Sequence, residues 1–309
     1  GPEETRRKRS EFLSRLDSWT AALKQEDDQI KIDMHPNVRA VMGNKNIAVC
    51  RKLVQHLKYG DVDLIADMTQ GFKMVGDIGQ CHVYPPASPT NTASVDKLRT
   101  VAQWAQHAVR GYLKRKGGDD MAKKSCLKEV EENTMKGPYT EAEVAEQFGN
   151  LWVPMPRFVI DQGKPRPIDH GSLYGQNATV AVPWRLVLGG IDELGVVATT
   201  WLRSVGKDRA VVIRLPDGTK LVGELHEDWS LEDAMSLRGR LADLESAFKQ
   251  FAAHPDHAYA RVVAVWDPDN EKVLYFLPLA LMFGEAGSVF GFNRGSKLLA
   301  TVVVRCADL

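Results

Sequence analysis

Two basic side chains lie on a predicted turn in the second half of the sequence. Residues 157–160 have the β-branched and aromatic composition of a strand, and a tight turn follows them. Lys164 and Arg166 lie at that turn, and Asn177 comes after it. An ammonium and a guanidinium in this position can contact a triphosphate, because Arg offers a planar fork of donors and Lys a compact charge. The alternative is an ordinary exposed basic turn.

A single carboxylate follows an apolar approach in the stretch 240–250. Asp243 is expected at the exposed end of a central strand, with an amphipathic helix beginning after it. A carboxylate there can bind Mg²⁺, and the carbonyl of Leu244 offers a second hard oxygen ligand. Phe248 can form the floor under a nucleotide sugar. The alternative is that Asp243 only caps the helix that follows.

Small residues follow an apolar stretch near the end of the sequence. Gly284, Gly287 and Ser288 come just after Phe283, where a backbone can pass close to a base pair or a template strand. The apolar residues 289–304 then predict a helix. A loop followed by a core helix is the alternative interpretation.

A possible metal-binding D-x-D is formed by Asp267 and Asp269. The Pro-Asp-Asn sequence around it lies between two β-rich runs, residues 259–266 and 272–276. Such a turn sequence between two strands favours a β-hairpin over a metal site.

The elements that must position these residues begin with helices. Apolar residues at three- and four-residue spacing predict helices over 13–23 and 46–58. A Gly- and Pro-rich stretch, 71–89, favours a loop. Ser94 is a suitable N-cap for a further helix, whose apolar stripe extends to Tyr112.

A basic segment, residues 114–128, follows that helix. Its first residues, up to Gly118, are typical of a helix end, with cations at the negative end of the dipole. The segment can contact phosphates or form a solvated loop. Thr140 and Glu143 then form a capping box that opens another helix.

The second half of the sequence mixes helix and strand. Residues 183–202 predict a long helix, and a Pro-Asp-Gly turn joins 209–215 to 220–225 in a predicted hairpin. We therefore expect a mainly helical region of unknown role, 1–149, followed by an α+β region, 150–309.

Composition narrows the class of protein. The 309 residues carry 40 basic and 40 acidic side chains, so the formal net charge is +0, which excludes a protein coated in positive charge but not a local basic groove. No apolar run is long enough to span a bilayer. The scattered cysteines disfavour a disulfide framework or a zinc site, and reduced thiols indicate an intracellular protein, cytoplasmic or nuclear. These cysteines are Cys50, Cys81, Cys126 and Cys306.

Taken in order, these segments resemble the reverse transcriptases of retrotransposons. The fingers pattern K-x-R-P-I-D with a later Asn is similar to residues 164–177. The first palm motif, D-L-x-S-A-[FY]-x-Q, is similar to 243–250. The hairpin and the L-P-…-F-G-x-x-x-S motif are similar to 259–288.

The resemblance implies a right-hand polymerase, here a partial fingers and palm domain after the helical region. It implies dNTP substrates, a primer–template of RNA or DNA, and two Mg²⁺ ions. Asp243 would bind both ions, with Leu244 as a further ligand. Lys164 and Arg166 would contact the triphosphate. The resemblance further implies that Phe248 excludes a ribose 2′-hydroxyl and that Phe283 and Gly284 line the nucleotide pocket.

The family's aromatic-x-Asp-Asp turn does not occur in the 309 residues. We therefore expect a fragment that is truncated before this motif. Two divalent ions about 4 Å apart repel each other and need several carboxylates. Asp243 alone cannot hold them, so we expect the chain by itself not to polymerise DNA.

Two other classes of function remain open. A non-catalytic nucleic-acid-binding module, from a decayed or domesticated element, would bind by charge through its basic segments. A helical interaction protein would leave the ordered motifs unexplained.

Overall fold

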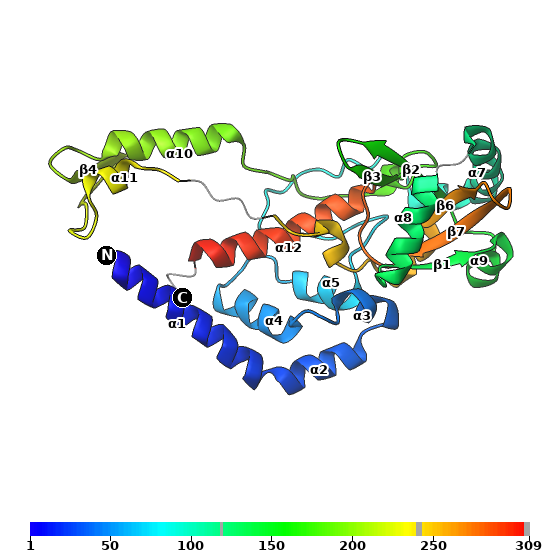
Figure 1. The fold of residues 1–309 in the computed structure, drawn as a ribbon, viewed down its shortest axis with the longest axis horizontal. Helices are drawn as coiled ribbons and strands as arrows, with labels where there is room; N and C mark the ends of the chain where they lie inside the picture. Colours follow the sequence, from blue (N-terminus) through cyan, green and yellow to red (C-terminus); the bar gives the residue numbers. More distant parts are fainter. Residues whose placement is uncertain (118–119, 239–242, 306–309) are drawn as a thin grey trace. The chain divides into compact units, whose positions relative to one another are not determined.

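The computed structural model describes residues 1–117, 120–238 and 243–305, and it is a mixed α/β protein (Figure 1). The α-helices are α1 (Pro2–Ala22), α2 (Lys24–Asp33), α3 (Pro36–Met42), α4 (Ile47–His56), α5 (Leu64–Gln70), α6 (Val95–Thr100), α7 (Ala102–Lys116), α8 (Asp120–Glu131), α9 (Glu141–Phe148), α10 (Ile191–Ser204), α11 (Leu231–Met235) and α12 (Ala286–Arg305). The strands are β1 (Met135–Tyr139), β2 (Pro154–Asp161), β3 (Pro165–Asp169), β4 (Ala210–Arg214), β5 (Lys220–Glu224), β6 (Val262–Asp267) and β7 (Lys272–Pro278). Three short 3₁₀ helices are η1 (Asn177–Thr179), η2 (Ala247–Gln250) and η3 (Pro255–Ala260).

The chain forms two compact units. The larger unit comprises Trp19–Leu186 and Glu245–Val302, and the smaller takes its described residues from Gly1–Ser18, Val187–Leu244 and Val303–Leu309. The predicted boundary near residue 149 falls inside the larger unit, where β1 lies before that point and pairs with β7.

A five-stranded sheet is the framework of the larger unit, with strand order β1-β7-β6-β2-β3. The hairpins β2–β3 and β6–β7 are antiparallel. The sequence predicts the second of them, but for the first it predicts only strand β2 and the turn after it. Strands β2 and β6 join them in parallel, with Pro154 opposite Val262. The sheet thus places the basic turn and the second hairpin side by side.

Helices cover both faces of this sheet. Because side chains along β6 alternate between the faces, successive residues of this strand pack on opposite sides. Val262 and Ala264 pack in one cluster with α7, while Val263 and Val265 pack in another with α8. Trp152 is the largest fully buried side chain of the unit. This two-faced burial explains why β6 reads as a continuous apolar run.

The local signals for helix ends are confirmed. The hydroxyl of Ser94 accepts a hydrogen bond from the N–H of Lys97. Gly117 ends α7 with a φ of 77°, in the left-handed region. Thr140 and Glu143 form the complete capping box of α9. The basic segment after Gly117 is helical where it is described, in α8.

The smaller unit contains the predicted hairpin β4–β5, with Val212 opposite Val222. The helix predicted over 183–202 is shorter in the structure and begins at Ile191. Gly189 and Gly190 precede it, and glycine disfavours helix, so the acidic first turn starts only after them. Among the described residues, no helix combines the length and the apolar character needed to cross a membrane.

Candidate functional site

The 279–285 loop, which joins β7 to α12, contacts the first of the three candidate stretches. The N–H of Asp169 donates to the carbonyl of Phe283 at 2.9 Å. Gly284 has a φ of 99°, and a Cβ at that position would overlap the carbonyl oxygen of Asp169. Only glycine therefore fits this conformation and this close approach.

The side-chain amide of Asn177 forms hydrogen bonds with the end of the same loop. Its Nδ2 donates to the carbonyl of Gly284 at 2.9 Å, and its Oδ1 accepts from the N–H of Ala286 at 2.8 Å. Nδ2 also donates to Ser172 at 2.9 Å. The amide satisfies one acceptor and one donor of the backbone at the start of α12, which a carboxylate could not do.

The second candidate stretch meets the loop through aromatic rings. Phe248 lies edge-on to Phe283, with 4.7 Å between the ring centroids, and 5.1 Å from the Phe292 ring. Phe283 is 46% exposed, so one side of this cluster is open to solvent. Residues from the first two stretches therefore contact the 279–285 loop, which belongs to the third.

A buried ionic cluster links strands β2 and β3 to helix α8. Arg157 donates to both carboxylate oxygens of Asp169, at 2.8 and 2.9 Å, and to Glu129 at 2.7 Å. The other oxygen of Glu129 pairs with Lys249 at 3.0 Å. Burial alone would lower the pKa of Arg157, but the two carboxylates hold it well above its usual value. Asp169 is therefore a structural carboxylate.

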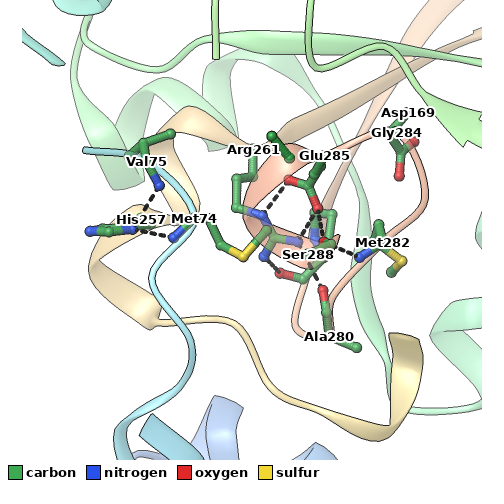
Figure 2. A network of polar contacts seen from close by, with 12 residues as sticks. Met74, Val75, Asp169, His257, Arg261, Ala280, Met282, Gly284, Glu285 and Ser288 are labelled. Carbon is green, nitrogen blue, oxygen red and sulfur yellow. Dashed lines mark hydrogen bonds and ion pairs between the residues drawn. The ribbon is translucent and has the colours of Figure 1, made fainter. Parts of the chain in front are cut away.

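A second buried ion pair fixes the loop itself (Figure 2). Arg261 donates to both oxygens of Glu285, each at 2.6 Å, and to the carbonyl of Ala280 at 2.8 Å. The hydroxyl of Ser288 accepts from the N–H of Met282 at 2.9 Å. The guanidinium of Arg261 therefore binds both ends of the loop, and the hydroxyl of Ser288 binds its middle.

The small residues of the third stretch contact the chain's own backbone. A Cβ on Gly287 would lie 2.8 Å from the Cα of Met74, and Ser288 is fully buried. Gly284 meets Asp169 in the same way. At each of these positions, atoms of the chain itself occupy the space beside the small residue.

Lys164 and Arg166 are exposed on the β2–β3 hairpin, with Arg166 opposite Ile160. Asp243 and Leu244 are also exposed, but they belong to the smaller unit. The strand expected before Asp243 falls largely on residues 239–242, outside the described residues. The helix expected after it is only the 3₁₀ turn η2, because Ala252 pairs with Ala280 and draws the chain into an extended form.

The described residues do not fit a two-metal centre. Within them, no group of three or more His, Cys, Asp or Glu side chains is placed to hold a metal ion. Asp267 accepts from Lys123 at 2.6 Å and from Asn270 at 2.8 Å. These hydrogen bonds lower its pKa and favour the hairpin over a D-x-D metal site.

Sequence reasoning missed the residues that hold the site in shape. His257 accepts from the N–H groups of Met74 and Val75, at 2.8 and 3.3 Å (Figure 2). Its pKa is lowered to about 4, chiefly by burial. The pairing of Arg157 with Asp169 follows from the hairpin register, but no signal in the sequence links Arg261 to Glu285.

Comparison with known proteins leaves the family open: no family model matches the chain, and neither does any curated protein or solved structure.

Proposed function

We propose that this chain forms the fingers and part of the palm of a reverse-transcriptase-like polymerase. One observation carries the proposal. Two stretches that resemble polymerase motifs contact the 279–285 loop of the third such stretch, the first through Asp169 and Asn177 and the second through Phe248. A chance resemblance would not require these stretches to meet.

The proposed roles follow from the exposed groups. Lys164 and Arg166 are exposed on the β2–β3 hairpin, where they can contact the triphosphate of a dNTP. The half-open rings of Phe248 and Phe283 offer an apolar surface to a sugar and a base. The primer–template would bind by charge, with a strong dependence on salt.

Catalysis would require carboxylates beyond those described. Asp243 can supply one, and the 309 residues contain no aromatic-x-Asp-Asp motif. We therefore expect the chain alone to bind a primer–template without extending it. In an intact polymerase, Asp243 would be one of several ligands of the two Mg²⁺ ions.

A pair of assays tests the proposal. Fluorescence anisotropy compares a duplex with a recessed 3′ end against a blunt duplex of equal charge, at several salt concentrations. We expect about tenfold tighter binding of the recessed end, a preference that Phe283→Ala abolishes. Trp104→Ala is the matched control, because Trp104 is 63% exposed on α7 and contacts Tyr174 rather than the loop.

Primer extension in Mg²⁺ is the second assay. Extension that Asp243→Ala abolishes would support the polymerase assignment and contradict the predicted inactivity of the chain alone. Equal affinity for recessed and blunt duplexes would overturn the assignment.

The alternative function is a non-catalytic nucleic-acid-binding module. The observation that favours it is the lack of a metal-holding group within the described residues. This module would bind all duplexes of equal charge alike, and neither Asp243→Ala nor Phe283→Ala would change the affinity.

A further inference from the structure

The β4–β5 hairpin of the smaller unit has one covered edge and one open edge. Val205 forms a β-bridge with Val211 and so covers the outer edge of β4. All five residues of β5, Lys220–Glu224, are exposed, with Val222 at 74%. This strand contains no proline, a residue that commonly blocks a sheet edge. Strand β5 therefore presents an edge that another strand can join.

The unused hydrogen-bonding groups of this edge belong to alternate residues. The hairpin is bonded at both ends, because the N–H of Leu215 donates to Thr219 and the N–H of Leu225 donates to Arg209, each at 2.8 Å. In an antiparallel pair, hydrogen-bonded residue pairs alternate with pairs that are not bonded. The N–H and C=O groups of the even-numbered residues of β5 therefore point away from β4. These residues are Lys220, Val222 and Glu224.

The charges along this edge suit a second copy of the same strand. Within the hairpin, Lys220 lies opposite Arg214, and Glu224 lies opposite Ala210. Like charges in opposite positions are unfavourable, and neither cation has a carboxylate at ion-pair distance in the described parts of the chain. If a second β5 runs antiparallel with Val222 at the centre, each Lys220 lies opposite Glu224 of the other copy. The strand is therefore complementary to itself in charge.

We propose that the chain forms a symmetric dimer in which the β5 strands of two copies pair antiparallel about Val222. The outward N–H and C=O groups of each copy bond those of the other. The pairing joins two two-stranded sheets, which are marginal by themselves, into one larger sheet. The interface is isologous, so each contact occurs twice. It lies within the smaller unit and does not depend on the polymerase assignment.

The dimer also covers apolar surface. Val222 lies opposite Val212 in the hairpin, so their side chains point to the same face of the sheet. In the dimer, these two valines and their counterparts in the second copy form one row across that face. Cross-strand pairs of β-branched side chains stabilise a sheet, and the row removes Val222 from water.

Sedimentation equilibrium of the full chain, from about 1 to about 200 µM, tests the proposal, because an interface of this size is expected to be weak. We expect a monomer at the low end and a dimer at the high end. Lys220→Glu sets two carboxylates against each other and should raise the dimer dissociation constant about tenfold or more. Glu224→Lys should do the same with two ammonium groups. The matched control is Lys207→Glu, which makes the same charge change at an exposed position outside β5.

Mixing the two single variants tests the register of the strands. Neither variant should dimerise well alone, because like charges meet in each case. In the mixed dimer, each introduced side chain faces an opposite charge on the other copy, so the affinity should return to about that of the unmodified chain. The double variant Lys220→Glu/Glu224→Lys should dimerise alone for the same reason.

Amide hydrogen exchange followed by NMR identifies the strand that pairs. Leu221 and Gly223 bond to β4, so their amides should be protected in the monomer and in the dimer. The amide of Val222 should exchange freely in the monomer and about tenfold or more slowly in the dimer. Val222→Pro removes only an outward N–H, so it should abolish the dimer and leave the unfolding temperature of the dilute protein unchanged.

Three results would overturn the proposal. The first is a monomer throughout the concentration range, which would leave the β5 edge to a strand of another protein. The second is a dimer that Lys220→Glu and Glu224→Lys weaken no more than the Lys207→Glu control does. The third is a dimer in which the amide of Val222 exchanges as fast as in the monomer, since the two copies would then meet elsewhere.

Discussion

Arg261 and Glu285 form a two-pronged ion pair, with both N–H···O distances at 2.6 Å and both side chains at most 5% exposed. Arg261 lies just before β6, and Glu285 lies just before α12. The pair therefore fixes where the 279–285 loop ends and the last helix begins.

Neutralising Glu285 should destabilise the larger unit strongly. Glu285→Gln leaves the guanidinium of Arg261 buried without a counter-charge, which costs about 3 to 5 kcal/mol of unfolding free energy. Urea unfolding measures this loss. The control Asp96→Asn breaks an exposed pair with Arg99 and should cost less than about 1 kcal/mol. A similar small loss for both variants would contradict the structural role of the pair.

A side chain at Gly284 should cost more than its backbone angle alone explains. Gly284→Ala must both adopt a positive φ and displace the carbonyl of Asp169. Gly163→Ala is the matched control, because Gly163 has a φ of 79° with open space around it. We expect about 1 to 2 kcal/mol for the control and clearly more for Gly284→Ala in urea unfolding. Equal losses would mean that the loop adjusts without strain.

Local features of this fold could be predicted from the sequence. Ser94 and Thr140 act on N–H groups three residues away, so their caps leave a readable signal. The hairpins β4–β5 and β6–β7 were readable for the same reason, whereas strand β3 was expected only as part of a turn. The split into two units was not, because it depends on which distant segments pack together.

In the candidate site, too, the local features could be predicted from the sequence and the long-range contacts could not. The sequence predicted the separate stretches around Arg166, Phe248 and Gly284, but not their contacts. Arg261 and Glu285 meet only after the sheet has formed, and His257 finds its donors in a segment more than 180 positions earlier. No periodicity connects residues at such separations.

The stability of the larger unit should fall in acid because of His257. Its neutral ring accepts two backbone N–H groups, and burial lowers its pKa from 6.5 to about 4. The unfolded chain then binds more protons between pH 6.5 and pH 4. Unfolding free energy therefore decreases as pH falls through this window, by on the order of 2 to 3 kcal/mol.

Chemical unfolding at pH 7, 5.5 and 4 checks this pH dependence. His257→Gln should show a flatter profile than the unmodified chain, because the titrating ring is gone. His107→Gln, at an exposed position, should keep the original slope. Parallel profiles for all three proteins would assign the acid sensitivity to other groups.

Asn177 should not tolerate a carboxylate. Asn177→Asp replaces the donor to the Gly284 carbonyl with an acceptor, which sets two oxygens against each other. We expect a loss of about 2 kcal/mol in unfolding free energy. Asn293→Asp changes a half-exposed amide that, within the described residues, bonds only to the Val289 carbonyl of its own helix, and it should cost at most about 0.5 kcal/mol. Faster proteolytic cleavage near residue 284 in Asn177→Asp alone would locate the effect.

The strand order also determines when each strand can pair while the chain is synthesised on the ribosome. Strand β2 emerges early, yet its parallel partner β6 begins only at Val262, and β1 waits for β7 still longer. Until then the nascent chain carries two unpaired strand edges beside apolar side chains, which is a state open to aggregation. Residues 135–161 are therefore the segment most open to aggregation until the second hairpin leaves the ribosome.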